Sequence, residues 1–312
     1  MHRYRVHGLE LASEIPITGR PSAAGLSELS VRLAKTAPIP KSPPPGALLL
    51  AREADGQSYS ITREASGQHR IRFGQLADFA LSSDRRSCLV TPDRNSVPGY
   101  AEVLLVGNVL AVVLALDGRP TLHASAVMWH DVGVAFAGPS HSGKTRLAAA
   151  LCQRGARLVT DDTLRVGVGR DARVEQWPGS TALRLRCTLD AAPAEWSAAQ
   201  SADGRTLTFP PLVKDVQPLH HLCLLHPASG RPGLSPLQGG RAFAQLHANM
   251  RITGWNSGPP LRDQFEATRE LFPKLRLWKL QFDPRQAPDA ALTGLLFNRL
   301  IQERCVEPRR AL

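Results

Sequence analysis

The chain has 312 residues, of which 43% are hydrophobic and 21% charged, and its formal net charge is +11. A chain of this length and hydrophobicity can bury one large core or two modest ones. No uninterrupted apolar run reaches the roughly 18 residues of a membrane helix, and the opening MHRYRVHGLE lacks the apolar core of a secretory signal. We therefore expect a cytoplasmic protein that has no membrane partner.

The excess of positive charge could serve nucleic acid, an acidic lipid surface, or an acidic or phosphate-bearing ligand. The arginines stand singly or in pairs, and aromatic residues make up only 5% of the chain, so no basic run carries rings for base stacking. We expect no nucleic-acid partner. The cysteines are odd in number and form no CxxC pair, which argues against a disulfide framework and a zinc site. Most of them are expected to be small buried side chains.

Residues 1–95 are predicted to form a β-rich N-terminal domain. Stretches such as YRVHGLELAS, LSVRLAK and QSYSITRE alternate apolar and polar residues between turns rich in Gly, Pro and Ser, as strands and hairpins do. The following stretch, residues 101–116, favours a buried helix, with a pair of strands as the alternative because of its valines. The β-rich part has no chemical motif, but it could present a substrate at an exposed sheet edge.

Residues 96–312 are predicted to form an α/β domain. LHASAVMWHD predicts a short strand with a turn, VGVAFAG a strand buried on both faces, residues 145–155 a helix that ends at Gly155, and ARLVTDD another buried strand. Further strands are predicted at DTLRVGV, TALRLR and HHLCLLHP, and helices at residues 240–250, 260–272 and 288–303. The loop after VGVAFAG lies at the carboxyl end of a strand, where open α/β sheets bind ligands.

That loop, GPSHSGKT, matches the phosphate-binding pattern G-x-x-x-x-G-K-[ST] between a strand and a helix. The glycines let backbone N–H groups turn toward phosphate oxygens, Lys144 can reach the β and γ phosphates, and the Thr145 hydroxyl can bind Mg²⁺. The helix dipole points its positive end at the same anion. His141 is interpreted as a feature of loop shape rather than an acid or base. The predicted nucleotide-binding residues are Gly138, Pro139, Ser140, His141, Ser142, Gly143, Lys144, Thr145 and Arg146.

Two acids follow the loop and one histidine precedes it. Asp161 and Asp162 close the strand ARLVT, and they would stand beside the γ phosphate if that strand were adjacent to the strand before the loop. One acid would hold Mg²⁺ and the other would accept a proton from an attacking hydroxyl. The alternative is that Asp162 only caps the DDT turn. His123, in TLHASAV, would by itself be read as a structural histidine.

Together, LHASAV and GVAFAGPSHSGKTRLAAALCQRGARLVTDD resemble the catalytic core of HPr kinase/phosphorylase and of the HPr kinase-like serine kinases of peptide-tailoring pathways. In that family a histidine precedes the loop, an RG dipeptide ends the helix, and a pair of aspartates ends the next strand. The matching positions are His123, Arg154, Gly155, Asp161 and Asp162.

The resemblance implies a P-loop kinase core of the HPr kinase type that uses ATP, with GTP as an alternative, and Mg²⁺. It implies that the catalytic residues are Asp161 as the general base, His123 close to that acid and to the phosphates, and Lys144, which grips the nucleotide with the loop amides. It also implies that Thr145 and Asp162 hold the metal. The regulator enzymes have a glycine-rich signature with an acid after this core. Here the region reads VEQWPGSTALRLR, with Glu175 as the nearest counterpart of that acid.

The opening YRVHGLELASEIP and the β-rich part that follows look similar to kinases of lasso-peptide and related ribosomal peptide pathways. That resemblance implies a peptide or protein substrate that carries a serine, near the C-terminus of a precursor. Kinases of the regulator type assemble as oligomers, so a homo-oligomer is a further expectation.

Two other functions stay open at this point. A nucleotide-dependent switch or ATPase would release phosphate without a phosphorylated product, and a small-molecule kinase would phosphorylate a sugar hydroxyl. The candidates for further positive charge around the phosphates are Arg146, Arg184, Arg186, Arg251 and Lys214.

Overall fold

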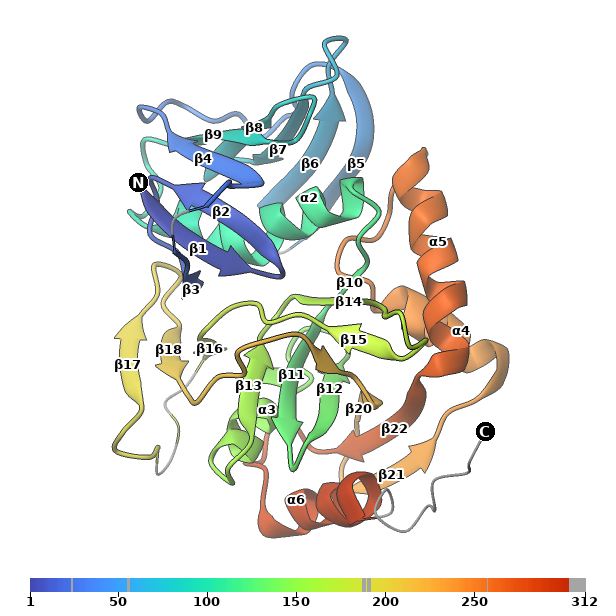
Figure 1. Cartoon of the computed structure of the whole chain (residues 1–312). Coiled ribbons are helices and arrows are strands. Elements are labelled where there is room, and N and C mark those ends of the chain that lie inside the picture. Colours follow the sequence, from blue (N-terminus) through green and yellow to red (C-terminus); the bar gives the residue numbers. More distant parts are fainter. Residues whose placement is uncertain (24, 55–56, 187–188, 190–191, 257, 303–312) are drawn as a thin grey trace. The chain divides into compact units, whose positions relative to one another are not determined.

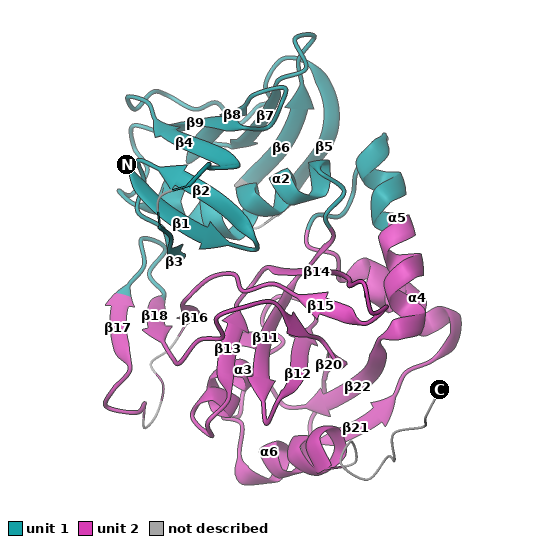
Figure 2. Cartoon of the chain, viewed as in Figure 1, with its two compact units in different colours: residues 1–119, 200–205, 252–264 teal, residues 120–199, 206–251, 265–312 magenta. Residues whose placement is uncertain are grey.

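Figure 1 shows the computed structural model of the chain, which describes residues 1–302 except 24, 55–56, 187–188, 190–191 and 257. The chain has a mixed α/β structure with many strands and few helices, and it divides into two compact units (Figure 2). Unit 1 contains residues 1–119, 200–205 and 252–264, and unit 2 contains residues 120–199, 206–251 and 265–312. The functional division predicted after residue 95 stays a prediction, because these units are defined by compactness alone.

A nine-stranded sheet forms most of unit 1, in the order β3-β1-β2-β4-β9-β8-β7-β6-β5. Neighbouring strands are antiparallel except in the pairs β2–β4 and β4–β9. The alternation read from the sequence is visible in β7, where His69, Ile71 and Phe73 are buried and the arginines between them are not. The strands are β1 (His2–Val6), β2 (Leu9–Ser13), β3 (Arg20–Pro21), β4 (Leu29–Leu33), β5 (Ala47–Ala54), β6 (Gln57–Arg63), β7 (His69–Phe73), β8 (Ala77–Leu81) and β9 (Ser87–Pro92).

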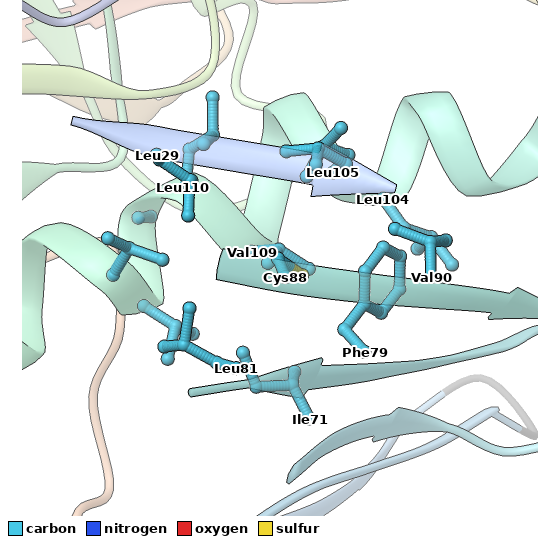
Figure 3. Close-up of a cluster of buried hydrophobic side chains, with 14 of the residues drawn as sticks. Leu29, Ile71, Phe79, Leu81, Cys88, Val90, Leu104, Leu105, Val109 and Leu110 are labelled. Carbon is cyan, nitrogen blue, oxygen red and sulfur yellow. The ribbon is translucent and has the colours of Figure 1, made fainter. Parts of the chain in front are cut away.

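The apolar stretch that follows this sheet is helical, which confirms the helix predicted over residues 101–116. It consists of α1 (Tyr100–Leu104), a π-helical segment (Leu105–Val109) and α2 (Leu110–Leu116). Its buried leucines and valines share one core cluster with sheet residues such as Phe79 and Val90, and Figure 3 shows part of that cluster. Removing this apolar surface from water, at about 25 cal/mol per Å², stabilises the helix on the sheet.

The central sheet of unit 2 has six strands in the order β13-β11-β12-β20-β22-β21, and Figure 1 shows β13, β11 and β12 side by side. β12, β20 and β22 are parallel, whereas β11 is antiparallel to both of its neighbours and β21 is antiparallel to β22. β12 is buried at all six positions, as predicted for a strand covered on both faces. The strands are β11 (Ala124–Trp129), β12 (Val132–Ala137), β13 (Arg157–Thr160), β20 (His221–Pro227), β21 (Gly233–Pro236) and β22 (Arg276–Phe282).

A tight hairpin turn joins β11 to β12. His130 and Asp131 have positive φ angles of 45° and 60°, and both residues are exposed. Two successive residues with positive φ match the right-handed twist of a two-residue hairpin. The turn predicted after LHASAVMW is therefore confirmed.

The remaining strands form two smaller sheets, in the orders β10-β14-β15-β19 and β16-β18-β17. Their strands are β10 (Thr121–Leu122), β14 (Leu164–Val168), β15 (Val174–Gln176), β16 (Leu183–Leu185), β17 (Ser197–Gln200), β18 (Thr206–Phe209) and β19 (Gln217–Pro218).

Each helix predicted after the phosphate loop is present, although residue 303 of the last one lies outside the described residues. They are α3 (Lys144–Cys152), α4 (Gly239–Ala248), α5 (Pro259–Leu271) and α6 (Ala290–Leu296), with a 3-10 turn (Phe272–Lys274) after α5 and a π-helical segment (Phe297–Gln302) after α6. Within the described residues, every helix is too short or too polar to cross a membrane.

The cysteines that the structure describes match the expectation of buried, unlinked side chains. Cys88, Cys152 and Cys223 are buried and free, and burial raises the pKa of each thiol well above its usual range. Cys187 and Cys305 lie outside the described residues.

Candidate active site

The predicted phosphate loop connects β12 to α3 and so lies between a buried strand and the start of a helix. Pro139, Ser140 and His141 are exposed at its tip, whereas Gly138 and Ser142 are buried. His141 has a φ of 65°, a conformation uncommon outside glycine, which supports its interpretation as a residue that shapes the loop. The N–H groups at the start of α3 have no partner within the helix, so this end of the helix suits an anion.

Gly143 is required here for two reasons. It caps α3 with a φ of 94°, in the left-handed region that glycine adopts without a steric cost. A Cβ at this position would also lie only 2.9 Å from Cζ of Phe282, the last residue of β22. The sequence pattern predicted the backbone requirement but not the contact with Phe282.

The side chain of Lys144 folds back over the loop. Its Nζ donates to the carbonyl oxygens of Gly138, at 2.8 Å, and Pro139, at 2.9 Å. Burial lowers the pKa of Lys144 to about 8, although the two nearby aspartates partly oppose this. A bound phosphate would supply the negative charge that favours the protonated lysine.

Three strands bring the predicted residues to one edge of the sheet. The expectation that β13 is adjacent to β12 is wrong, because β11 lies between them. Since β11 is antiparallel to both neighbours, it begins at the edge where they end. His123, directly before β11, therefore reaches the same edge as the loop after β12 and Asp161 after β13. The three strands were predicted correctly from the local sequence, whereas their order in the sheet was not.

Asp161 is hydrogen-bonded to the first turn of α3. Its Oδ1 accepts hydrogen bonds from Thr145 Oγ1, at 2.9 Å, and from Ser125 Oγ, and its Oδ2 accepts one from the backbone N–H of Arg184, at 2.9 Å. The residue is buried, and burial raises the pKa of Asp161 despite these donors. A carboxylate with a raised pKa is a better proton acceptor than a solvated one.

The pKa of Asp162 is shifted in the opposite direction to that of Asp161. Its Oδ2 accepts a hydrogen bond from Nη2 of Arg251 at 2.9 Å, and His123 Nδ1 lies 3.2 Å from its Oδ1 and 3.2 Å from its carbonyl oxygen. Burial disfavours the charged form, but Arg251 and His123 outweigh burial and hold the pKa of Asp162 far below its usual range. Asp162 has a φ of 68°, so its backbone is held in a sparsely populated conformation of the kind that clusters at functional sites.

The candidate basic residues occupy different places. Arg251 also donates from Nε to Thr163 Oγ1 at 3.1 Å, so its guanidinium is fixed beside the two acids. The positive charge of Arg184 contributes to the lowered pKa of Asp162. Arg146, predicted to bind nucleotide, donates instead to the carbonyl oxygen of Pro284 at 2.8 Å. Arg186 and Lys214 are exposed.

The oxygen donors at this edge fit a Mg²⁺ ion that arrives with a nucleotide. Mg²⁺ prefers hard oxygen ligands and usually takes only one or two carboxylates, since phosphates and water complete its shell. The Thr145 hydroxyl and the carboxylates of Asp161 and Asp162 are donors of this kind. Across the residues that the structure describes, no group of three or more His, Cys, Asp or Glu side chains could hold a metal alone. Glu175 lies on β15, opposite Gly167 of β14.

Ser125 is a residue of this site that the sequence analysis missed. It is fully buried on β11, and its hydroxyl donates to Asp161. Since side chains alternate along a strand, residues 123 and 125 point to the same side, and this spacing was the signal that could have revealed Ser125.

No protein-family model matches the sequence, and no curated protein matches it. Among solved structures, the HPr(Ser) kinase/phosphatase from Coxiella burnetii is similar over 60% of this chain and 96% of its own length, with 14% identity and a TM-score of 0.31. Because a TM-score this low does not establish a shared fold, the function has to be inferred from the residues of the site.

Proposed function

We propose that the protein is a Mg²⁺-dependent kinase that transfers the γ-phosphoryl group of ATP to a serine hydroxyl of a peptide or protein. The observation that carries the proposal is the hydrogen bond from Thr145, in the phosphate loop, to Asp161, at the end of β13. In P-loop enzymes the loop threonine and an acid at this place surround the metal and the terminal phosphate. The chain brings both groups together although Thr145 lies in α3, after β12, and Asp161 follows β13, which is not a neighbour of β12.

In this proposal the nucleotide phosphates lie in the loop from Gly138 to Thr145. The loop N–H groups and the start of α3 bind the phosphate oxygens, and Lys144 releases the carbonyl oxygens of Gly138 and Pro139 to bind the β and γ phosphates. Mg²⁺ would neutralise charge on the phosphates, with Thr145 and Asp162 as its proposed ligands. Asp162 suits that role because its lowered pKa keeps it ionised at neutral pH.

Asp161 is the proposed general base, since its pKa is raised and that of Asp162 is lowered. The serine Oγ attacks the γ phosphorus of ATP, its proton passes to Asp161, and the bond from the γ phosphorus to the β,γ-bridging oxygen breaks. The products are phosphoserine and ADP. Arg251 and His123 hold Asp162 in place beside the reacting groups, so most of the catalytic effect comes from positioning and charge.

The class of acceptor rests on the resemblance of LHASAV and GPSHSGKT…RGARLVTDD to serine kinases. The narrowest form of the proposal is a ribosomal precursor peptide of the lasso type with a serine near its C-terminus. The two alternative functions differ in the acceptor of the phosphoryl group: an ATPase or switch transfers it to water, and a small-molecule kinase transfers it to a sugar hydroxyl.

The test is to incubate the purified protein with γ-labelled ATP, Mg²⁺ and a peptide that ends in serine. The matched control is the same peptide with alanine in place of the serine. We expect label in the serine peptide only, and none with the Lys144→Ala variant. Free phosphate released at the same rate with either peptide would identify an ATPase or switch, and label in a sugar but in no peptide would identify a small-molecule kinase.

A further inference from the structure

Unit 2 contains a cavity of about 390 Å³ that the proposed reaction does not use. This volume lies within the range of sites that bind small molecules. The cavity is formed by the turn before β15, the segment that joins β19 to β20, and the start of β22. Its lining residues are Ala172, Arg173, Val174, Pro218, Leu219, His220, His221, Lys274 and Arg276.

The cavity lies toward the edge of the central sheet opposite the phosphate loop. His221 and Arg276 are the first residues of β20 and β22, and they are paired with each other in the sheet. β20 is parallel to β12, with His221 beside Val134, so roughly 13 Å of strand separates this position from Gly138. A ligand in the cavity would therefore not occupy the candidate active site.

The lining of the cavity is basic. Arg173, Lys274 and Arg276 contribute three cationic side chains, and none of the nine lining residues, all of which the structure describes, is acidic. Asp171 lies 3.5 Å from Arg173, but both side chains are largely exposed, so this pair offsets little of the charge. The cavity is thus a concave surface of positive potential, which attracts anions.

The two lining histidines are both held by a hydrogen bond to Nδ1. The backbone N–H of Gly133 donates to His220 Nδ1 at 2.9 Å, and the indole N–H of Trp278 donates to His221 Nδ1 at 3.1 Å. A neutral imidazole whose Nδ1 accepts a hydrogen bond carries its proton on Nε2. A neutral His220 ring therefore carries its proton on Nε2, whereas the Nε2 atom of His221 is enclosed in the protein and is not exposed to the cavity.

We propose that this cavity binds a small molecule that carries a compact group with two negative charges, a phosphate or a dicarboxylate. Guanidinium groups match the oxygens of either group with paired donors, and Lys274 adds a point charge. Val174, Pro218 and Leu219 supply the apolar surface for the rest of the ligand. The proposal does not depend on the kinase activity, because the cavity shares no residue with the phosphate loop.

The test is isothermal titration of the Lys144→Ala protein with inorganic phosphate and with succinate, at constant ionic strength. The Lys144→Ala background weakens anion binding at the loop. We expect saturable binding that becomes about tenfold or more weaker when Lys274→Gln and Arg276→Gln are added, because each change removes a charge-assisted donor. The matched control adds Arg231→Gln and Arg241→Gln, two exposed arginines of unit 2 outside the cavity, and should bind like the background protein.

Binding of phosphate alone, of succinate alone or of both would support the proposal and identify the preferred anion. Arg173→Gln, on another wall of the cavity, should weaken the same binding and provides a second variant if the change in β22 lowers the melting temperature. The proposal is overturned if neither anion binds saturably, or if both cavity variants bind as tightly as the control.

Discussion

Replacing Asp161 by asparagine removes the proposed base and nearly preserves its shape. In the native protein this carboxylate accepts hydrogen bonds from the hydroxyls of Thr145 and Ser125 and from the backbone N–H of Arg184. Asparagine can turn its oxygen toward the Arg184 N–H and its NH₂ toward the two hydroxyls, which can rotate to accept. Asp161→Asn therefore keeps an acceptor for the Arg184 N–H, while the hydroxyl protons of Ser125 and Thr145 lose the acceptor that the carboxylate gave them.

The expected effect on stability follows from the sign of the pKa shift. Burial raises the pKa of Asp161, so its contribution to folding stability is fully present at low pH and is lost as the pH rises through its folded-state pKa. Ionising this buried carboxyl opposes folding relative to a solvated carboxyl, whereas asparagine cannot ionise. The loss of this unfavourable ionisation and the loss of an acceptor for the two hydroxyl protons offset each other, so we expect Asp161→Asn to stay within about 1 kcal/mol of the wild-type free energy of unfolding. Phosphoryl transfer should fall by about 10²–10⁴-fold, the range for loss of a general base.

The assay compares label transfer, nucleotide affinity by calorimetry and thermal unfolding for wild type, Asp161→Asn and Asp161→Ala. Alanine offers no acceptor to the Arg184 N–H, so Asp161→Ala should lose about 1–3 kcal/mol of stability as well as transfer. Equal transfer by wild type and Asp161→Asn would refute the role of Asp161 as base. Unfolding of the asparagine variant as early as the alanine variant would refute the hydrogen-bond argument.

Three further predictions concern the loop and the acid pair. Nucleotide affinity should be constant below about pH 7 and should weaken as the pH rises through about 8, because phosphate binds the protonated form of Lys144. Titration calorimetry across this pH range should show the loss of affinity in wild type and not in Lys144→Ala. Gly143→Ala should abolish nucleotide binding and lose more stability than Gly155→Ala. Both glycines have positive φ, but of the two only Gly143 has a side chain, that of Phe282, where a Cβ would lie. Equal melting temperatures of the two variants would contradict the importance of this contact. Arg251→Gln should cost about 1–3 kcal/mol because the half-buried Asp162 carboxylate loses its charge-assisted hydrogen bond to the guanidinium. Adding Asp162→Asn should restore part of the loss in a double-mutant cycle by chemical denaturation, and strictly additive losses would show that the pair is not coupled.

The phosphate loop was predictable from the sequence because every part of its signal is local. The apolar run of β12, the glycines and the start of α3 follow one another along the chain, and each has its own physical signature. The buried helix over residues 101–116 was predictable for the same reason. Its π-helical middle was not, because that irregularity depends on how the helix packs.

The order of the strands could not be read in the same way. The local sequence of a strand does not identify the strand that pairs with it, so the position of β11 between β12 and β13 was not predictable from local patterns. β22 was missed because RLWKLQF does not alternate strictly, and the packing of Phe282 against Gly143 was missed with it. Among the candidate arginines, only the fold determines that Arg251 binds Asp162 while Arg146 binds the carbonyl oxygen of Pro284.

The hairpin turn at His130 and Asp131 offers a place to attach an optical reporter. β12 spans the sheet between this turn and the phosphate loop, so a fluorophore at position 131 would lie roughly 20 Å from Gly138. That separation is short enough for efficient energy transfer to a dye-labelled nucleotide. Since Asp131 is exposed, such a probe would follow nucleotide occupancy in real time from outside the site.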